Sequence, residues 1–332
     1  MTLNSPLASP KATIDRLTQW QIGTRKSLGQ HFLIDDGVVG RILRLAAPVA
    51  DEAVIEVGPG IGTLTEALLL VGARVFAIEK DERLLPVLAD IASRYPGRFT
   101  FTHADALSVL AVLGTTCTTG ITDTPDALNS PPSSTLSVPA TAATSTPAGN
   151  APSATAAPGT SATALVANLP YAVAATIVLD CFQHLPTVQS ATVMVQKEVA
   201  ERMAAEPGSK DYGAYTVKLR LFAKPAARFT VSPSSFLPPP RVDSAVIRLD
   251  RHDEQLGAAE LRACFTVIEA AFAERRKTVR NSMRSSFAAR GLDPAQVDAL
   301  LAASAISPTA RGETLTVADF RRIGHHFAAS SG

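Results

Sequence analysis

Hydrophobic positions divide the first third of the chain into short apolar runs and longer segments with helical spacing. The apolar runs have the length of strands, and they occupy residues 54–57, 74–78 and 99–102. The segments in which apolar side chains recur every three or four positions occupy residues 38–46, 64–71 and 84–93. Strands that alternate with helices in this way predict a parallel, doubly wound α/β sheet.

This alternation stops at about residue 114. From residue 114 to residue 163 the chain is dominated by Ala, Thr, Ser and Pro, and no Lys or Arg occurs between Arg98 and Lys197. Such a segment has too little large apolar surface to offset the entropy lost on ordering. We therefore predict a disordered surface insertion over residues 114–163, with a docking arm as the alternative.

The alternation returns after the insertion. We expect strands at residues 164–167, 191–196, 228–231 and 242–249, and helices at residues 172–184 and 197–205. From about residue 254 onward the pattern is helical. The chain is thus predicted to have three parts. They are a flexible tail over residues 1–25 with one short helix near residues 14–20, an α/β domain over residues 26–252, and a helical domain over residues 253–332.

Composition sets wider limits. The chain has 332 residues, of which 46% are hydrophobic, so it can bury the core of one large domain and a small one. Its net charge of +1 does not exclude a nucleic-acid partner, because acidic residues elsewhere can balance a basic face. Cys117, Cys181 and Cys264 are far apart in sequence, which argues against a disulfide framework and a zinc site. No signal peptide or membrane-spanning run is evident, so we expect a cytoplasmic protein without a metal.

Three glycines follow the first predicted strand. The pattern Glu56-x-Gly58-x-Gly60-x-Gly62 places them at a strand-to-helix turn, where the absence of side chains lets a ligand approach the backbone closely. Thr63 stands where the dinucleotide fingerprint GxGxxG requires its last glycine. The carboxylate of Glu56 suits a ligand with a cationic end, such as a methionyl ammonium, and would repel a pyrophosphate. Taken alone, the pattern also fits a tight turn that binds nothing.

Acidic residues end the next two predicted strands. Glu79 comes 21 residues after Gly58, and its carboxylate can accept hydrogen bonds from both hydroxyls of a ribose. Asp105 follows the third strand and can accept a hydrogen bond from an adenine amino group. Ligands of such sheets bind outside the carboxyl ends of the strands. Together with the glycine turn, the two carboxylates argue strongly against an empty turn.

The sequence Asn168-Leu169-Pro170-Tyr171 ends another predicted strand and should face the same crevice. An adenine amino nitrogen is a poor nucleophile because its lone pair is delocalised into the ring. The side-chain oxygen of Asn168 and the carbonyl of Leu169 can accept hydrogen bonds from that amino group and aim its lone pair at a methyl donor. Pro170 stiffens the turn, and Tyr171 offers a ring on which a flipped-out base can stack. In isolation these residues fit an ordinary asparagine-proline turn equally well.

Five motifs occur in a characteristic order. They are Lys26–Leu33 (KSLGQHFL), Glu56–Gly62, Asn168–Tyr171, Val195–Met203 (VQKEVAERM) and Phe236–Ala245 (FLPPPRVDSA). In these motifs the chain resembles the KsgA-type (RsmA) ribosomal RNA adenine dimethyltransferases, from about Arg25 to the C-terminus and apart from the insertion. The resemblance implies a Rossmann-like, class I S-adenosylmethionine-dependent methyltransferase sheet. It also implies that the small C-terminal helical domain recognises rRNA.

The same resemblance implies a reaction. Two neighbouring adenosines near the 3′ end of 16S rRNA would each become N6,N6-dimethyladenosine within an immature small ribosomal subunit, with S-adenosylmethionine as the donor and no metal. The donor contacts are expected at His31, Leu33, Gly58, Glu79, Asp105 and Asn168, and the glycine turn adds Gly60. The target base is expected between Tyr171 and Phe236, although Phe236 can instead be a core aromatic. Because the insertion follows Asp105, we expect it beside the entrance of the site. We expect a monomer.

A basic segment lies in the predicted helical domain. Arg276, Arg280 and Arg284 are four residues apart, so they should share one helix face, with Arg275 and Lys277 beside them. Three arginines without alternating acids repel one another unless an anion binds, and RNA phosphate is the candidate anion. A solvated charged helix face is the other interpretation.

Other functions remain open at this point. A macrolide-resistance type methyltransferase, which modifies an adenine of large-subunit rRNA, shares the glycine turn and an Asn-x-Pro-aromatic motif. Residues 29–32 and 195–203 favour the small-subunit enzymes. A non-catalytic ribosome assembly factor is a further alternative, although the complete donor motifs argue against a purely structural role. A DNA adenine methyltransferase and an NAD oxidoreductase fit the motifs less well.

Overall fold

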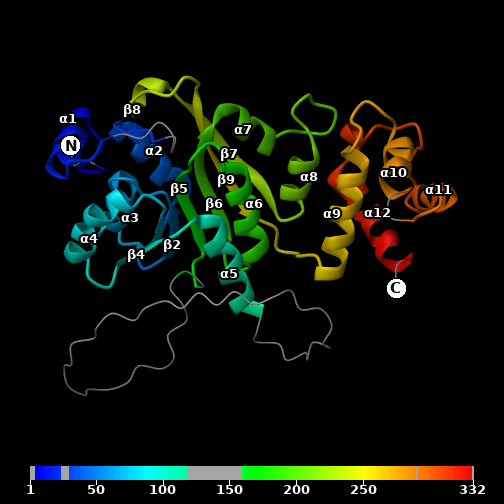
Figure 1. The fold of residues 1–332 in the computed structure, drawn as a ribbon, viewed down its shortest axis with the longest axis horizontal. Coiled ribbons are helices and arrows are strands. Elements are labelled where there is room, and N and C mark those ends of the chain that lie inside the picture. Colours follow the sequence, from blue (N-terminus) through cyan, green and yellow to red (C-terminus); the bar gives the residue numbers. More distant parts are fainter. Residues whose placement is uncertain (1–3, 24–29, 119–158, 160, 289–290, 331–332) are drawn as a thin grey trace, which may run out of the picture.

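The computed structural model describes residues 4–23, 30–118, 159, 161–288 and 291–330. Figure 1 shows a central sheet with helices on both faces. A second group of helices lies at one end of the molecule, where the chain reaches its C-terminus. Seven strands form the large sheet in the order β4-β3-β2-β5-β6-β9-β7, and β1 and β8 form a separate two-stranded sheet.

The elements have the following bounds. The strands are β1 (Phe32–Leu33), β2 (Ala53–Val57), β3 (Arg74–Glu79), β4 (Phe99–His103), β5 (Ala164–Asn168), β6 (Ser190–Gln196), β7 (Ala223–Val231), β8 (Phe236–Leu237) and β9 (Ser244–Arg251). The α-helices of the sheet region are α1 (Pro10–Gln19), α2 (Asp36–Ala46), α3 (Thr63–Leu70), α4 (Leu85–Arg94), α5 (Ala106–Thr118), α6 (Ala174–His184), α7 (Lys197–Met203) and α8 (Ala214–Arg220). Those that follow the sheet are α9 (Ala258–Phe272), α10 (Val279–Ala288), α11 (Pro294–Ala303) and α12 (Val317–Ser330).

Every strand of the large sheet except β9 runs in the same direction. β2 to β6 pair in parallel, whereas β9 pairs antiparallel with both β6 and β7. The predicted parallel, doubly wound α/β arrangement is confirmed for β2 to β6, and β9 adds an antiparallel strand to it. The connection from β7 to β9 contains no α-helix that could return the chain to the opposite edge, so β9 runs back beside β7. As a result, β9 begins at the edge where the parallel strands end.

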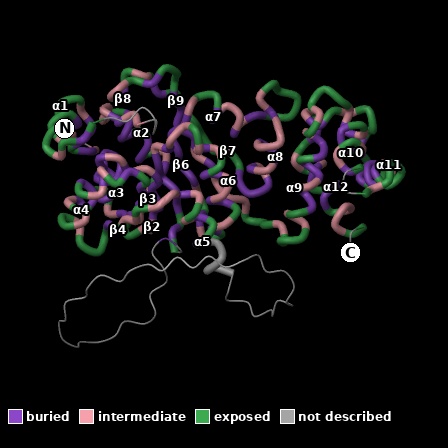
Figure 2. Tube along the Cα trace, in the orientation of Figure 1, coloured by how far each residue is buried: buried purple, intermediate pink, exposed green. Residues whose placement is uncertain are grey.

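Residues of the central strands alternate between two hydrophobic layers. Val54 and Val166 pack in one cluster with α2, α3 and α4, whereas Ile55 and Leu165 pack in another with α5 and α6. This alternation covers both faces of the sheet, which explains why the strands read as nearly continuous apolar runs. Figure 2 shows the buried positions concentrated along these central strands.

The strands and helices predicted within residues 38–103 and 164–205 are confirmed, with small shifts at their ends. Three features were not expected from the pattern: α5, α8 and the β1–β8 pair. The α5 helix runs without a sequence boundary into the Ala/Thr-rich segment. The α8 helix is a short element, and the strands β1 and β8 have two residues each, so none of these carries a clear periodic signal.

Residues 4–23 differ from the predicted loose tail. The α1 helix begins at Pro10, earlier than the helix expected near residues 14–20, and the Ser9 hydroxyl caps it by accepting from the N–H of Ala12 at 3.2 Å. The backbone N–H groups of Asn4 and Ser5 donate to the carboxylate of Asp36 at 3.2 and 2.9 Å. Apolar side chains of the segment are buried, namely Leu7, Ala8 and Ile22. A few such anchors order a segment whose composition is polar overall.

The two ends of the predicted insertion belong to the fold. The α5 helix continues to Thr118, and the backbone N–H of Thr163 donates to the carbonyl of Ala53 at 2.9 Å, just before β5. Residues 119–158 and 160, on which most of the predicted disorder falls, lie outside the described residues. The α5 helix has already carried the chain away from the carboxyl ends of the strands when it ends. Both attachment points therefore lie at the amino-terminal edge of the parallel strands (Figure 1).

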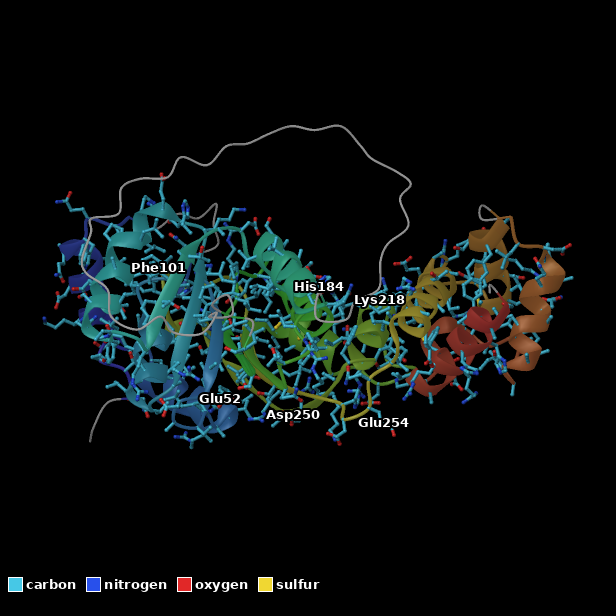
Figure 3. All side chains as sticks on the ribbon, turned by 90° about the horizontal axis from the view of Figure 1, so that it is seen from below. Glu52, Phe101, His184, Lys218, Asp250 and Glu254 are labelled. Atoms are coloured by element: carbon cyan, nitrogen blue, oxygen red, sulfur yellow. The ribbon has the colours of Figure 1, made fainter. Side chains whose placement is uncertain are left out.

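Figure 3 views the molecule from this amino-terminal side, with Glu52 before β2 and His184 at the end of α6. The carboxyl ends of the strands lie at the other edge. We expected the insertion beside the entrance of the site. This expectation is wrong for its attachment points, because both lie at the edge of the sheet away from the carboxyl ends of the strands.

The helices α9 to α12 form the helical part predicted from about residue 254 onward. Their core is continuous with that of the sheet region, since Cys264, Val267 and Phe320 belong to the same hydrophobic cluster as α5 and α6. The hydroxyl of Tyr212 also donates to the carbonyl of Leu315 at 2.8 Å. The division at residue 252 remains a prediction. Within the described ranges, every helix falls short of what a membrane crossing requires in length and apolar character.

These attachment points predict that the insertion is dispensable for the stability of the fold. Replacing residues 121–157 with a flexible linker of about 15 residues keeps both attachment points, at Thr118 and Thr163. The shorter loop loses less entropy when the fold brings its ends together. We expect the unfolding temperature, measured by circular dichroism, to stay the same or rise slightly. A fall of about 2 °C or more, equivalent to roughly 1 kcal/mol for a protein of this size, would contradict the assignment.

Candidate active site

The carboxyl ends of β2, β3 and β5 open on one cavity of about 590 Å³. Its walls are the glycine turn, the loops after β3 and β5, the start of α5 and residues 30–33. The volume lies within the range of small-molecule and cofactor sites. The cavity brings together every predicted donor and base residue except Phe236: His31, Leu33, Gly58, Gly60, Glu79, Asp105 and Asn168–Tyr171.

The three glycines of the turn have positive φ angles of +69°, +60° and +92°. A Cβ atom at Gly58 would lie 3.7 Å from Cδ of Pro170, and one at Gly60 would lie 3.3 Å from the ring of Phe32. A Cβ atom at Gly62, in contrast, would lie only 2.2 Å from Cδ1 of Ile91 in α4. Gly58 and Gly60 thus present bare backbone to the cavity, whereas Gly62 allows the first turn of α3 to pack against α4.

Backbone N–H groups hold the carboxylate of Glu79. Lys80 and Asp81 each donate to its Oε1 at 2.8 Å, and Gly60 donates to Oε2 at 3.4 Å. Burial raises the pKa of Glu79, and the three N–H groups oppose that shift by stabilising the charged form. A carboxylate has room for further donors, so the fixed Glu79 side chain can still accept hydrogen bonds from a ribose.

Glu56 is almost completely buried and lines the same cavity, with 1% of its surface exposed. The hydroxyl of Thr65 donates to its Oε2 at 2.6 Å. Burial raises the pKa of Glu56 to about 8, the Thr65 hydrogen bond opposes this shift, and the charge of Glu79 adds to it. A cationic group bound beside Glu56 would stabilise the charged form of the carboxylate. A ligand with such a cationic end is the partner that the sequence predicts for Glu56.

Asp105 forms an exposed ion pair beside the start of α5. Its Oδ2 lies 2.7 Å from Nζ of Lys80, and its Oδ1 accepts from the N–H of Leu107 at 3.0 Å. The hydrogen bond from Lys80 lowers the pKa of Asp105, so the side chain is an acceptor. Because both side chains are open to solvent, the pair contributes little to stability and Lys80 can yield to a ligand amino group.

Asn168 and His31 hold each other in place. Nδ2 of Asn168 donates to the backbone carbonyl of His31 at 3.3 Å. Nδ1 of His31 lies 2.7 Å from the carbonyl oxygen of Pro238, and since a carbonyl only accepts, this nitrogen carries the proton. With its nitrogen engaged, the Asn168 amide presents its oxygen as the remaining acceptor, as the predicted chemistry requires.

The ring of Tyr171 is held at two points. It stacks on the ring of His31 with centroids 5.8 Å apart and planes 23° apart. Its hydroxyl lies 2.6 Å from Oγ of Ser244, the first residue of β9. Burial raises the pKa of Tyr171, opposed by the Ser244 hydrogen bond, so the phenol stays neutral at physiological pH.

Phe236 departs from its predicted place. Only 2% of its surface is exposed, and it packs in the core with Val39 and Ile42 instead of lining the cavity. Its backbone pairs with Leu33 in the β1–β8 sheet. The predicted sandwich of a base between Tyr171 and Phe236 does not match this arrangement, because β8 directs the Phe236 side chain into the core. The ring that lies beside Tyr171 is His31.

Several residues of the site were given no individual role in the sequence analysis, although Gln30, Gln196 and Ser244 lie in its motifs. Gln30 donates through Nε2 to Oδ2 of Asp81 at 2.8 Å, across 51 positions of sequence. Arg83 donates to both oxygens of Asp81 and lowers its pKa to about 2. This network ties the segment before β1 to the loop after β3. Two further residues, Gln196 on the cavity wall and Ser244 behind Tyr171, also became apparent only in the structure.

A family model described as "Ribosomal RNA adenine dimethylase" matches residues 22–322. The chain belongs to this family. It is therefore an rRNA adenine dimethyltransferase that uses S-adenosylmethionine as its methyl donor.

Similar proteins match nearly the whole length of this chain. "Ribosomal RNA small subunit methyltransferase A" of Leifsonia xyli is 39% identical over 307 residues, covering 91% of this chain and 92% of the relative. The protein of that name from Geobacillus kaustophilus is 34% identical, covering 97% of each chain.

Two solved structures share the fold. A dimethyladenosine transferase from Plasmodium falciparum has a TM-score of 0.63 at 21% identity, covering 88% of this chain and 96% of its own. The 23S rRNA methyltransferase ErmE has a TM-score of 0.56 at 24% identity, covering 89% of this chain and 99% of its own. At these identities, the two structures support the fold alone.

The predicted basic face of this dimethylase is divided. Arg280 and Arg284 lie on α10, whereas Arg276 lies in the preceding turn, outside the helix. Arg280 donates through Nε and Nη2 to Asp298 of α11 at 2.8 and 2.6 Å, and Arg284 contacts the same carboxylate. The expectation of three arginines on one helix face without a neutralising acid is therefore wrong, because α11 supplies the acid.

The turn before α10 contains the other basic residues. Arg275 pairs with Glu313 at 3.1 Å, and Lys277 pairs with Glu274 at 2.5 Å. Arg276 is exposed, and no carboxylate within the described ranges pairs with it. Of the five predicted RNA contacts, Arg276 is the guanidinium most open to an incoming phosphate.

The burial of Glu56 predicts a stability that falls as the pH rises. The folded pKa of about 8 exceeds the ordinary 4.5, so between these values the folded protein keeps a proton that the unfolded chain releases. The stabilising contribution is complete below about pH 4.5 and is lost as the pH rises to about 8. Glu56→Gln, which is neutral throughout, should match the wild-type unfolding temperature near the lower pH and exceed it near the upper pH without ligand. Equal pH slopes in thermal unfolding would contradict this.

Proposed function

We propose that this protein transfers methyl groups to the N6 amino groups of two adjacent adenosines near the 3′ end of 16S rRNA. Each adenosine becomes N6,N6-dimethyladenosine while the small ribosomal subunit matures. The protein acts as a monomer in the cytoplasm, on an immature small subunit, and its C-terminal helices bind the rRNA.

One observation carries this proposal: the residues predicted to contact the methyl donor and the Asn168–Tyr171 motif line a single cavity. The choice of the small subunit is supported by relatives named for that substrate, at 33% to 39% identity over most of the chain. The large-subunit alternative shares the glycine turn, the Asn-x-Pro-aromatic motif and the fold of a 24% identical structure, but residues 29–32 and 195–203 favour the small-subunit enzymes. A purely structural assembly factor would have no use for this pocket.

The residues of the cavity fit S-adenosylmethionine. Glu79 can accept from the ribose hydroxyls, and Asp105 can accept from the adenine amino group once Lys80 yields. Glu56 supplies the negative partner for the methionyl ammonium. The bare backbone of Gly58 and Gly60 allows close approach, and residues 31–33 close the opposite wall. When bound, the donor supplies a methyl group on a positively charged sulfur.

The protein contributes positioning of the acceptor amine. The Asn168 oxygen and the Leu169 carbonyl accept the two amino hydrogens, which directs the nitrogen lone pair towards the methyl group. The N–H of Leu169 donates to the carbonyl of Met194 at 3.0 Å, so β6 fixes the backbone on the amino-terminal side of the accepting carbonyl. No side chain has to act as a base, because the methylated amine is cationic and loses its proton readily. Alignment of this kind can supply much of a rate enhancement.

Methyl transfer to purified ribosomal substrates tests the proposal. Labelled donor is mixed with the protein and unmethylated small subunits, with large-subunit RNA and duplex DNA as parallel substrates. Dimethyladenosine in the small-subunit RNA alone would support the proposal. Label in large-subunit RNA would assign the protein to the resistance-type enzymes, and no label despite donor binding would overturn the catalytic function.

Asn168→Ala should abolish most of the activity. It removes an acceptor that acts on the reacting amine, so we expect kcat to fall by about 10²-fold or more, as when an oriented transition-state hydrogen bond is lost. Donor binding, measured by calorimetry, should change far less, because the cavity has several other donor contacts. Asn168→Asp keeps an acceptor oxygen and should retain more activity than the alanine variant. Unchanged turnover in Asn168→Ala would remove the proposed role of the amide.

Arg276→Gln should weaken RNA binding more than Arg280→Gln does. Arg276 has no acidic partner within the described residues, whereas Arg280 is engaged by Asp298. Binding to small subunits is measured at several salt concentrations. Loss of one phosphate contact should reduce the slope of log affinity against log salt by about one. Arg280→Gln should mainly lower the unfolding temperature. Equal effects of both variants on the salt slope would contradict this division.

A further inference from the structure

Ser244 is a completely buried polar residue that the donor chemistry does not use. It is the first residue of β9 and none of its surface is exposed. A buried hydroxyl without a partner is costly, and that of Ser244 finds its partner in the hydroxyl of Tyr171 at 2.6 Å. The bond joins a rigid strand to a residue that lies in the loop between β5 and α6.

We propose that Ser244 is a positioning residue that fixes the Tyr171 ring for the target base. The inference rests on the proposed function in one respect, since it assumes that the base stacks on Tyr171. It goes beyond that function because it names the residue that sets the orientation of the stacking surface.

The position of Ser244 is fixed by its neighbours in the sheet. Its backbone is in register with Gln196 of β6 on one side and with Val231 of β7 on the other. The N–H of Lys197 also donates to the carbonyl of Asp243 at 3.0 Å. A hydroxyl held in this way has little freedom, so it is a fixed point against which a mobile ring can be aligned.

The Tyr171 ring is thereby tethered at both ends. Its Cβ end is attached to the backbone that follows Pro170, and its hydroxyl end is bound to Ser244. Its centroid lies 5.8 Å from that of His31, within the range of offset stacking. Since His31 covers one side of the ring, an incoming base must use the other side.

Residues 236–244 control both contacts. The carbonyl of Pro238 holds the His31 ring at 2.7 Å, and Ser244 holds the Tyr171 hydroxyl. The connection that buries Phe236 thus acts on the base site through two hydrogen bonds. Without the Ser244 bond, the ring can rotate about χ1 and χ2 when the base arrives. The loss should therefore appear in turnover and leave donor binding unchanged.

Two single variants and their double test the bond. Ser244→Ala removes one partner, and Tyr171→Phe removes the other while keeping the ring. At saturating donor and RNA, each should lower kcat by about tenfold, the worth of one hydrogen bond. The double variant should be no slower than the slower single variant, because both changes remove the same interaction. Donor affinity by calorimetry should stay at the wild-type value in all three.

Ser304→Ala is the matched control for a buried serine that has no part in the site. Ser304 is 1% exposed and its hydroxyl donates to the carbonyl of Leu300 at 2.7 Å in α11. It should lose stability and keep wild-type kcat. If Ser304→Ala lowers kcat as much as Ser244→Ala does, or if the losses of the two site variants multiply, the effect is general destabilisation and the inference is overturned.

A readout that needs no substrate separates this inference from the proposed function. The chain has four tyrosines, so ring resonances of selectively labelled tyrosine can be assigned by comparison with Tyr171→Phe. Ser244→Ala should speed the flipping of the Tyr171 ring or shift its resonances. Unchanged ring dynamics would overturn the inference even if the wild type is active. A wild type that transfers no methyl group, with ring dynamics that respond to Ser244→Ala, would overturn the proposed function alone.

Discussion

The site depends on the pairing of β1 with β8, which joins two segments about 200 residues apart in the chain. The pairing is short, but the side chains of Phe32, Leu33 and Phe236 are buried beneath it, so hydrophobic burial holds it in register. It brings residues 30–33 over the carboxyl ends of the parallel strands, where they close the cavity. The hydrogen bonds of His31 to Asn168 and Pro238 require this placement.

Two buried carboxylates give the cavity its charge preference. Glu56 and Glu79 sit at the ends of adjacent strands, and burial raises the pKa of each. Glu79 is compensated by backbone N–H groups, whereas Glu56 has the single hydroxyl of Thr65. Burial alone therefore favours a protonated Glu56, and a cationic ligand favours its ionisation. Burial of Glu56 lowers the stability of the folded protein at higher pH, and it makes the ionisation of this carboxyl depend on the charge of the ligand.

The sheet region and the C-terminal helices share one core, so the basic turn before α10 has a defined place relative to the cavity. Within that basic segment, charge alone does not identify the RNA contacts. Arg280 and Arg284 serve to join α10 to α11 through Asp298, and Arg275 is bound to Glu313. Arg276 remains as an exposed guanidinium. The insertion joins the fold at the opposite edge of the sheet from the cavity, so a long segment can be added there without a change in the cavity walls.

The sequence by itself determined the local chemistry: the strand and helix pattern, the glycine turn, Glu79, Asp105 and the Asn168–Tyr171 motif. These features follow from apolar periodicity and from residue types at short spacing, so they can be read without coordinates. The direction of β9, the burial of Phe236, the partner of Arg280 and the contact of Ser244 with Tyr171 came only with the tertiary structure. Each of them depends on which distant segments meet, and local sequence does not encode that. The long-range packing of the core, which selects one arrangement of the elements over its alternatives, decided them.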